Sequence, residues 1–376
     1  MQYVSMKKIA ILLNTSWYIY NFRRNLIKEL IKNGFQVTAI APFDEYSSKL
    51  EELGCDFHPL GIDSKSKNPF YDISLLFRMR KVLAKTRPDV LLNFTIKPNV
   101  YGSLAARSLG IKCINNVAGM GTLFTDGLIS RTVLKGLFKI SQLKVKTVFF
   151  QNPDDFEELT KRNIVKKEIA HLLPGSGVNL SEFPFTPIYE SKQVNFLLIA
   201  RMIYPKGIKE LVLAAERLRE KGYHNFQVQL LGEMGVNNPL AIPASEMEQF
   251  CEKGYINYLG KTDDVKTVIQ QADAVILPSY YREGTPKSLL EALAIGRPII
   301  TTNMPGCKET VIDEVNGFIC DPKSIDDLAS KMERFLNLDF SKKLEMGKQS
   351  RKLAETKFDE QIVIDEYLKA INRALA

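Results

Sequence analysis

The 376-residue sequence lacks the features of membrane-spanning, disulfide-stapled and zinc-binding proteins. It has no uninterrupted apolar stretch of about eighteen residues, which a transmembrane helix needs. Its five cysteines form no CxxC pair and are odd in number, which predicts a reduced protein with idle thiols. The three histidines, His58, His171 and His224, are too dispersed to indicate a zinc site. Internal repeats and low-complexity tracts are also missing.

Acidic residues are scarce in the first half of the chain. Residues 1–190 contain 26 Lys and Arg against 17 Asp and Glu, a net charge of +9, whereas residues 191–376 contain 25 against 26, a net charge of −1. A basic half beside a neutral one indicates an anionic partner, either a lipid surface or a nucleic acid. Two clusters are candidates: Arg78, Arg80, Lys81, Lys85 and Arg87, and Arg131, Lys135, Lys139, Lys144 and Lys146. The second also fits an ordinary amphipathic helix packed on a sheet.

One stretch, AVILPSYYREGTPKSLLEALAIG from Ala274 to Gly296, predicts a strand, a polar turn and a helix. Thr285 is the expected N-cap and Pro286 the expected first helical residue. Open α/β sheets bind ligands at such turns, and a helix start favours anionic groups. Glu283 and Glu291 lie eight residues apart here. Taken alone, they also fit a solvated loop charge and a surface helix residue.

A second strand-to-helix turn precedes this stretch. The apolar run from Val194 to Ala200 ends at Arg201, and Lys206-Gly207 opens the next helix. Arginine binds oxygens in a bidentate manner and lysine adds a point charge, so the two cations predict a clamp for a diphosphate.

The order Arg-x4-Lys-Gly and then Glu-x7-Glu, with LPSYYREG before the second part, resembles the family 4 retaining glycosyltransferases of the GT-B architecture. KPNVYGSLAARSLG (97–110) and INNVAGMGTLF (114–124) resemble the subgroup that builds capsule, O-antigen and protein-linked glycans on lipid carriers. The resemblance implies an α/β fold of two Rossmann-like domains facing a central cleft, and the length of the chain also favours two domains. The expected ranges are 1–185 for an acceptor- and membrane-facing domain, 186–358 for a nucleotide-sugar domain, and 359–376 for a terminal helix crossing back to the first.

The resemblance also implies roles for residues of the second half. Arg201 and Lys206 would neutralise the leaving diphosphate, Glu283 would orient the sugar, and Glu291 would hold the ribose hydroxyls. The remaining expected donor-binding residues are Gly207, Gly232, Gly260, Lys261, Gly284, Thr285 and Pro286. No metal and no cofactor beyond the nucleotide sugar are expected.

The acceptor side is expected in the first half, at Trp17, Tyr18, Lys97, Gly119 and Gly121. The first loop carries no glycine pair, unlike many relatives, and its helix is predicted at about Asn21–Asn33. Packing of Trp17 in the structure and solvation of Lys97 are equal alternatives. Because the loop after Ile114 offers no histidine or carboxylate, backbone groups of Gly119 to Gly121 are the predicted contacts.

The predicted protein is a retaining, metal-independent hexosyltransferase. It moves a sugar from a UDP-sugar to a polyprenyl-diphosphate-linked sugar in polysaccharide or glycoprotein glycan assembly. It would bind the inner face of the cell membrane peripherally through its basic half and bind no nucleic acid. One alternative is a sugar-nucleotide 2-epimerase of the same architecture. Another is a non-catalytic nucleic-acid or membrane-binding module, which the intact clamp disfavours.

Overall fold

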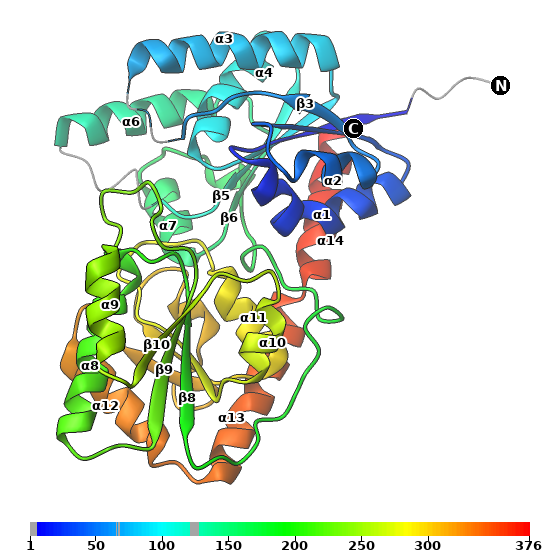
Figure 1. Ribbon diagram of the computed structural model, residues 1–376. Helices are drawn as coiled ribbons and strands as arrows, with labels where there is room; N and C mark the ends of the chain where they lie inside the picture. Colours follow the sequence, from blue (N-terminus) through cyan, green and yellow to red (C-terminus); the bar gives the residue numbers. More distant parts are fainter. Residues whose placement is uncertain (1–5, 65, 67, 121–127) are drawn as a thin grey trace. The chain divides into compact units, whose positions relative to one another are not determined.

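The computed structural model describes residues 6–64, 66, 68–120 and 128–376, and the chain forms two compact units. Unit 1 comprises Met1–Leu173 and Ile362–Ala376, and unit 2 comprises Pro174–Gln361. Each unit is a parallel sheet with helices on both faces (Figure 1). The predicted α/β fold with two Rossmann-like sheets is confirmed.

The strands of unit 1 pair in the order β3-β2-β1-β4-β5-β6-β7, all parallel. Their bounds are β1 Lys8–Leu12, β2 Gln36–Ala41, β3 Asp56–Pro59, β4 Val90–Phe94, β5 Lys112–Val117, β6 Thr147–Phe150 and β7 Ala170–Leu172. The chain builds β1 to β3 on one side and then returns to place β4 beside β1. The sheet therefore reverses its order between β1 and β4, the position at which open α/β sheets bind ligands.

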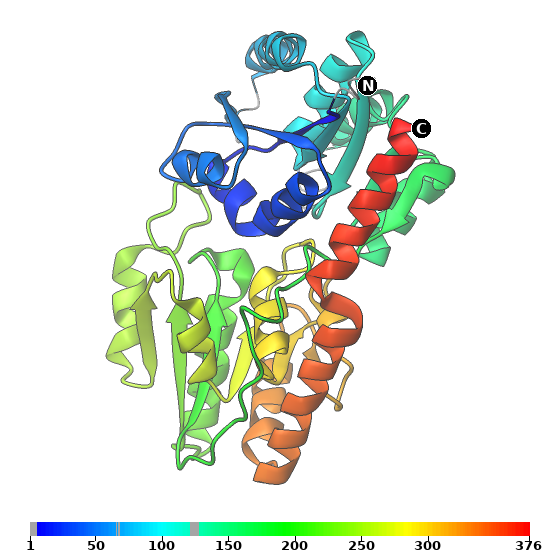
Figure 2. The same cartoon turned by 90° about the vertical axis from the view of Figure 1, so that its right-hand side faces the viewer.

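Side chains of successive strand residues point to opposite faces, so each strand feeds two apolar layers. Ile9 and Ile11 of β1 face a layer with α1 (Ser16–Lys32), α2 (Ser47–Glu52) and α14 (Glu360–Leu375). Ala10 and Leu12 face a layer with α3 (Pro69–Thr86), α4 (Ser103–Ser108), α6 (Leu128–Ser141) and α7 (Pro153–Lys161). In Figure 2 the C-terminal helix α14 is the red helix beside the strands of unit 1.

The first helix begins earlier than the sequence predicted. Helix α1 starts at Ser16, five residues before Asn21, because Thr15 caps it: the Thr15 hydroxyl oxygen accepts the Tyr18 N–H at 3.0 Å. Trp17 and Tyr18 therefore lie in the first helical turn and not in a loop.

The strands of unit 2 pair in the order β10-β9-β8-β11-β12-β13, also in parallel. Their bounds are β8 Val194–Ile199, β9 Phe226–Leu231, β10 Ile256–Gly260, β11 Ala274–Leu277, β12 Ile299–Thr302 and β13 Gly317–Cys320. One face is covered by α8 (Ile208–Glu220), α9 (Ala244–Glu252) and α12 (Ile325–Leu336). Residues of α10 (Val265–Gln270) and α11 (Lys287–Ile295) cover the other face, and α13 (Phe340–Leu353) packs against α11. Here the order reverses between β8 and β11.

The two units meet along the chain at Leu173/Pro174, twelve residues before the boundary placed at 185/186, and again at Gln361/Ile362. The composition of residues 181–192, which are polar and contain Pro184 and Pro187, favours a linker, but this segment packs on unit 2. Buried Arg297 donates to the Thr186 carbonyl oxygen at 2.6 Å, and Arg351 donates to the Phe183 carbonyl oxygen at 3.0 Å. These long-range hydrogen bonds leave no trace in local composition, which is why a polar, proline-bearing stretch was taken for a linker.

Candidate active site

The loops that follow β8 and β11 leave the sheet of unit 2 on either side of its reversal point. The first contains Arg201 and Lys206, and the second contains Glu283. Since parallel strands end at a common edge, the topology alone brings these residues toward one place.

Lys206 and Glu283 are in direct contact there. The Lys206 Nζ lies 2.6 Å from Glu283 Oε1 and 2.7 Å from Oε2, and the two side chains are only 12% and 14% exposed. Charges in such a shielded position interact more strongly than on an open surface. An ammonium has three N–H donors, and the two carboxylate oxygens use at most two of them. One donor of Lys206 is thus available for a further oxygen.

Ser279 fixes the carboxylate from the other side. Its hydroxyl lies 2.8 Å from Glu283 Oε1 and 3.1 Å from the Pro205 carbonyl oxygen, and its single proton serves one of them at a time. The same Pro205 carbonyl accepts the Tyr280 N–H at 3.0 Å. The loops after β8 and β11 are therefore joined through backbone as well as through the ion pair. Ser279 was not singled out from the sequence.

Two glycines allow this close approach. Gly207 has φ of 77°, and a Cβ there would lie 2.1 Å from the Pro278 carbonyl oxygen. Gly232 has φ of 149°, and a Cβ there would lie 1.8 Å from the carbonyl oxygen of Ala200, the residue before Arg201. Any larger residue would push the loop after β8 away from its neighbours.

Arg201 is exposed, so its guanidinium is accessible to an anion. Its backbone is held by Met202, whose N–H donates to the Glu233 carbonyl oxygen at 3.0 Å. The pKa of Tyr281 depends on both charged groups. Burial raises the pKa of its hydroxyl, Glu283 raises it further, and Arg201 lowers it. Arg201 and Glu283 are thus both close enough to Tyr281 to act on it.

Cys307 lies buried beneath this group. Burial raises the pKa of its thiol, and the nearby Glu283 carboxylate adds to the effect. The thiol therefore stays protonated, and the site has no cysteine nucleophile at this position. Within the described residues, no three His, Cys, Asp or Glu side chains form a group suited to a metal ion.

A second part of the same sheet edge follows β9 and β10. The Gly232 N–H donates to the Gly260 carbonyl oxygen at 2.7 Å, and the Tyr258 hydroxyl donates to the Gly232 carbonyl oxygen at 2.8 Å. Lys261 follows directly and is exposed. The predicted donor-binding residues Gly232, Gly260 and Lys261 therefore lie together, next to the loop that carries Arg201.

Helix α11 begins one residue later than predicted. Pro286 has an extended ψ of 125° and occupies the N-cap, so Lys287 is the first helical residue. The side chain of Thr285, which was expected to cap the helix, instead faces Gly175, where a Cβ would lie 2.6 Å from the Thr285 Cβ. The backbone of Gly284 is also tightly packed. A Cβ on Gly306 would lie 1.8 Å from the Gly284 carbonyl oxygen.

Glu291 lies in the second turn of α11 and is 8% exposed. Its Oε1 lies 3.6 Å from the Nζ of Lys287, one turn earlier. The surface-residue interpretation of Glu291 is therefore wrong. A carboxylate this buried, near the start of a helix, is well placed for hydrogen bonds to hydroxyl groups.

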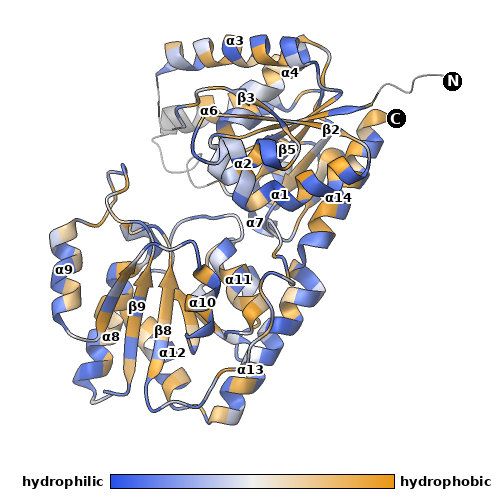
Figure 3. Cartoon of the chain, turned by 45° about the vertical axis from the view of Figure 1, so that its right-hand side comes forward, coloured by the Kyte–Doolittle hydropathy of each residue, from blue (hydrophilic) through white to orange (hydrophobic). Residues whose placement is uncertain are grey.

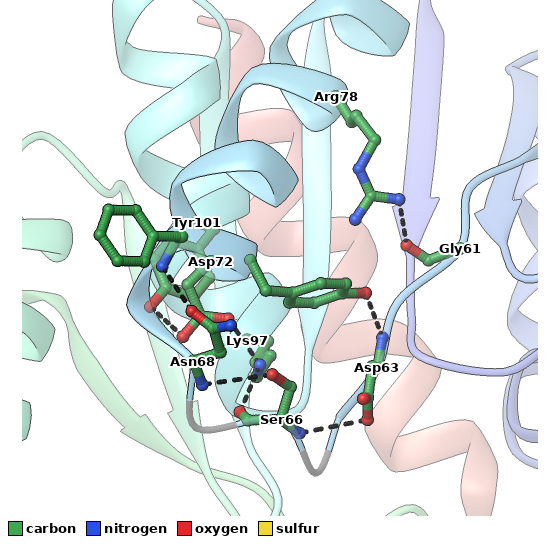
Figure 4. Close-up of polar contacts among 10 residues, drawn as sticks. Gly61, Asp63, Ser66, Asn68, Asp72, Arg78, Lys97 and Tyr101 are labelled. Carbon is green, nitrogen blue, oxygen red and sulfur yellow. Dashed lines mark hydrogen bonds and ion pairs between the residues drawn. The ribbon is translucent and has the colours of Figure 1, made fainter.

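In unit 1, Lys97 follows β4 and is bound to α3 (Figure 4). Its Nζ lies 2.6 Å from Asp72 Oδ1 and donates to the Ser66 carbonyl oxygen at 2.8 Å. Tyr101 donates to the other oxygen of Asp72 at 2.8 Å, and burial, aided by that carboxylate, raises the pKa of Tyr101. Lys97 is thus neither solvated nor unpaired, and both alternatives weighed for it omitted the contact with Asp72.

The other acceptor-side candidates of unit 1 have surroundings of their own. Trp17 is 41% exposed and lies edge-on to Tyr18 at a centroid distance of 5.0 Å. Gly119 has φ of 95°, a conformation that favours glycine. Gly121 lies outside the described residues.

Sequence reasoning passed over two polar groups buried in unit 1. Asn116 accepts from Gln151 at 3.1 Å and donates to the Tyr367 hydroxyl at 2.6 Å, which ties β5 to α14. Arg23 of α1 is 5% exposed, and its guanidinium lies 4.4 Å from the centre of the Phe94 ring. An arginine at an apolar position of the helical period was the available signal.

Comparisons with known proteins agree with these observations. Residues 182–353 match the model described as glycosyl transferases group 1, and residues 8–152 match the model described as glycosyl transferase 4-like. The chain is 30% identical to the N,N'-diacetylbacillosaminyl-diphospho-undecaprenol alpha-1,3-N-acetylgalactosaminyltransferase of Campylobacter jejuni, over 98% of this chain and 99% of that protein. It is 24% identical to the UDP-Gal:alpha-D-GlcNAc-diphosphoundecaprenol alpha-1,3-galactosyltransferase of Escherichia coli, over 70% of each chain.

Among solved structures, a glycosyltransferase from Rickettsia africae superposes with a TM-score of 0.81 at 17% identity, over 99% of both chains. At this identity the superposition speaks for the fold alone. Together with the full-length relative at 30% identity and the two family models, it shows that the chain belongs to the group 1, family 4-like glycosyltransferases of the GT-B architecture.

Proposed function

We propose that this glycosyltransferase moves a hexose or N-acetylhexosamine from a UDP-sugar to a polyprenyl-diphosphate-linked sugar, with retention of configuration and without a metal ion. The observation that carries the proposal is the shielded Lys206–Glu283 pair beside Arg201 at the reversal point of unit 2. Such a group supplies positive charge for a diphosphate and a carboxylate for hydroxyl groups in one place.

The cations act on the leaving group. Transfer breaks the bond between the anomeric carbon and the diphosphate oxygen, so negative charge grows on that oxygen. Arg201 offers a planar fork of donors, and Lys206 offers the N–H that Glu283 leaves unused. Fixed cations aimed at developing charge lower the barrier without reorganisation. This is the role that a divalent metal has in other transferases, and it supports metal independence.

The carboxylates act on hydroxyl groups. Glu283, held by Lys206 and Ser279, accepts from the donor sugar and orients its anomeric centre, while Glu291 accepts from the ribose. Gly207, Gly232, Gly260, Lys261, Gly284, Thr285 and Pro286 form the surrounding donor-binding surface. With no histidine assigned as a base, the leaving phosphate itself takes the proton of the acceptor hydroxyl on the face where it departs.

The relatives support the substrate classes and the stereochemistry. The names of both relatives specify an alpha-1,3 product and a diphospho-undecaprenol acceptor, and one specifies UDP-Gal. Because ordinary UDP-hexoses carry the nucleotide in the α configuration, an alpha-linked product requires retention. On the acceptor side we assign Trp17 and Tyr18 to stacking, Lys97 to the phosphates, and backbone groups near Gly119 and Gly121 to hydrogen bonding.

A lipid-linked acceptor places the reaction at a membrane surface, and unit 1 has a face suited to one. Phe70, Ile73 and Phe77 of α3 recur at helical spacing and are 79%, 54% and 65% exposed. Lys81 and Lys85 are exposed on the following turns. Figure 3 shows hydrophobic and hydrophilic residues alternating along α3. Exposed apolar side chains flanked by cations are typical of helices that bind an anionic membrane interface. Among the described residues, no helix is both long enough and apolar enough to cross a membrane.

Donor and acceptor specificity are tested in two steps. A panel of UDP-, GDP- and dTDP-sugars is screened by thermal shift, and the stabilising donors are then assayed for transfer to short polyprenyl-diphosphate sugars. We expect a UDP-hexose or UDP-N-acetylhexosamine to stabilise the protein, and an alpha-linked product by NMR. Interconversion of the nucleotide sugar without an acceptor would instead identify a 2-epimerase, and a beta-linked product would refute retention.

Membrane binding is tested by co-sedimentation with vesicles containing anionic lipid. Phe70→Ser/Phe77→Ser should weaken vesicle partitioning about tenfold or more, because two exposed rings are lost. The matched control is Ile312→Ser/Val315→Ser on unit 2, which also removes two exposed apolar groups. Equal partitioning of both variants would refute the assignment of this face. RNA binding that displaces the vesicles would favour a nucleic acid as the anionic partner.

A further inference from the structure

Arg23 is a buried charge in the interior of unit 1. Only 5% of its surface is exposed, and it belongs to the layer in which α1 and α14 cover the sheet. Its guanidinium lies 4.4 Å from the centre of the Phe94 ring and 6.0 Å from the centre of the Tyr367 ring. Phe94 is the last residue of β4, so the guanidinium lies near the carboxyl edge of the sheet, next to the point where the strand order reverses.

This cation has no carboxylate. In the described part of the chain, no Asp or Glu forms an ion pair with Arg23, and no acceptor takes a hydrogen bond from its Nε. Burial accordingly lowers the pKa of the guanidinium, opposed only by Tyr367. Buried arginines are normally paired with an anion. The free energy needed to remove the cation from water is much larger than the stabilisation that aromatic rings provide. Phe94 and Tyr367 therefore do not account for the charge by themselves.

Further unused polar atoms follow β1 and β4 at the same edge of the sheet. Leu12 of β1 pairs with Asn93 of β4, so Asn14 and Thr95, each two residues further along, leave the two parallel strands side by side. Asn14 Oδ1 and Thr95 Oγ1 are both buried and without a hydrogen-bond partner among the described residues. Thr95 also has φ of 68°, which a β-branched residue seldom adopts. Strained backbone and unused polar groups concentrate where ligands bind.

We propose that Arg23 is an anion-binding residue of unit 1, in addition to Lys97, and pairs with a phosphate oxygen of the diphosphate-linked acceptor. The Thr95 hydroxyl adds a second donor to the same phosphate, and the loop after β4 moves to admit it. This assignment rests on the proposed function for the identity of the acceptor. The presence of an oxyanion site at Arg23 does not depend on it.

With this site, each sheet binds a diphosphate beside the point where its strand order reverses. In unit 2, Arg201 and Lys206 hold the diphosphate that leaves, and in unit 1, Arg23 holds the diphosphate that stays on the acceptor. The guanidinium provides two parallel N–H groups for bidentate contact with a phosphate, which an ammonium does not. The choice of arginine at an otherwise apolar position of α1 follows from that requirement.

The first experiment measures anion binding without activity. Thermal melts are recorded with inorganic pyrophosphate in an Arg201→Ala/Lys206→Ala background, which removes the clamp of unit 2. We expect pyrophosphate to raise the Tm of this background by about 2 °C or more. Adding Arg23→Met should abolish the response, whereas adding Arg24→Met, the neighbouring and more exposed arginine, should preserve it. Loss of the response in both, or in neither, overturns the proposal.

The melts without anion give an independent readout. A buried cation without a bound anion destabilises the unliganded protein. Arg23→Met should therefore melt at the same temperature as the wild type or above it. A fall of several degrees would assign Arg23 to packing and overturn the proposal. Arg23→Lys retains the charge without the bidentate geometry, and its pyrophosphate response should be weaker than that of the wild type and stronger than that of Arg23→Met.

The second experiment identifies the source of the phosphate. Transfer is measured to a polyprenyl-diphosphate sugar and to the same sugar on a neutral alkyl chain. Arg23→Met should raise KM for the diphosphate acceptor about tenfold or more, and leave KM for the donor and for the neutral acceptor within about twofold. An equal penalty on both acceptors overturns the assignment to the acceptor diphosphate. If the wild type transfers to neither acceptor while the pyrophosphate response holds, the proposed function fails and the oxyanion site stands.

Discussion

In unit 2 the lysine at the reversal point is paired with Glu283, whereas in unit 1 the arginine beside the reversal point has no carboxylate partner among the residues that the structure describes. The sheets are alike: each is parallel, each is covered on both faces, and each reverses its strand order once. The difference therefore lies in the side chains and not in the architecture. The two halves of the sequence also differ in net charge, +9 for residues 1–190 and −1 for residues 191–376.

The comparison separates two ways of preparing a site for an anion. A cation that is already paired with a carboxylate stays in position when no ligand is bound, and it exchanges one oxygen for another when a ligand arrives. A cation that is buried without a partner binds its ligand more strongly, because binding also ends an unfavourable state, but it weakens the unliganded fold. We expect unit 2 to tolerate loss of its donor better than unit 1 tolerates loss of its anion.

The largest effect is expected from the clamp of unit 2. Arg201→Ala and Lys206→Ala should each lower kcat by about a hundredfold or more, since each removes a donor aimed at developing charge. The fold should be retained, as judged by far-UV circular dichroism. Lys209→Ala, at the exposed second residue of α8, is the matched control and should keep near-normal activity. Near-normal turnover of either clamp variant would mean that unit 2 does not prepare its site with cations.

The next effect concerns the glycine that holds the loops of unit 2 together. Gly232→Ala should destabilise the protein by more than about 3 kcal/mol, because its Cβ would lie 1.8 Å from the Ala200 carbonyl oxygen and backbone must shift. Gly235→Ala is the matched control. Its φ of 68° is also left-handed, but nothing lies within 4 Å of its Cβ, so we expect a loss of about 1 kcal/mol. Urea melts with equal midpoints for both variants would refute the close approach.

A smaller effect is expected at Lys97, a partly buried cation of unit 1 that is paired with a carboxylate. Lys97→Met and Asp72→Asn should each destabilise the protein by about 1–2 kcal/mol, because each leaves one partly buried partner alone. If Lys97 also meets the acceptor phosphates, the two variants should move KM for the acceptor in opposite directions. Lys97→Met should raise it, and Asp72→Asn, which releases the lysine, should lower it. Equal stability losses with unchanged KM would restrict Lys97 to holding α3 against the loop after β4.

The strands that lead into the candidate site of unit 2 were predictable from the sequence, and the physical reason is simple. Buried parallel strands are short apolar runs, so β8 and β11 were located without structural information. Arg201, Lys206 and Glu283 follow strands, and strand ends meet at one edge. The contact between Lys206 and Glu283 was not predictable, since it joins residues 77 positions apart and depends on the strand order.

The same limit explains what was missed in unit 1. Lys97 was interpreted from its own loop, but its partner Asp72 lies 25 residues earlier on a different helix. Arg23 drew no attention because a single arginine in a helix is usually a surface residue. Its burial becomes visible only when α14, more than three hundred residues further along, is packed against α1. Which cation is paired with which carboxylate is decided by the folded unit. The composition gives only the net charge.

The smallest effect tests whether the pairing of charges in unit 1 extends to its last strand. His171 of β7 lies 6.2 Å from the Phe149 ring, and burial, reinforced by Arg373 and opposed by Glu366, lowers the pKa of the imidazole below its ordinary 6.5. The unfolded chain therefore binds a proton more readily than the folded one. The stability contributed by the neutral imidazole is present above pH 6.5 and is lost as the pH falls through the folded pKa. Thermal melts of unit 1 between pH 7.5 and about 5 should fall less for His171→Gln than for the wild type, whereas His224→Gln on the surface of unit 2 should follow the wild type. A steeper fall for His171→Gln would mean that Glu366, and not burial, sets the charge of this histidine, and that unit 1 pairs its cations at β7 as unit 2 does at β8.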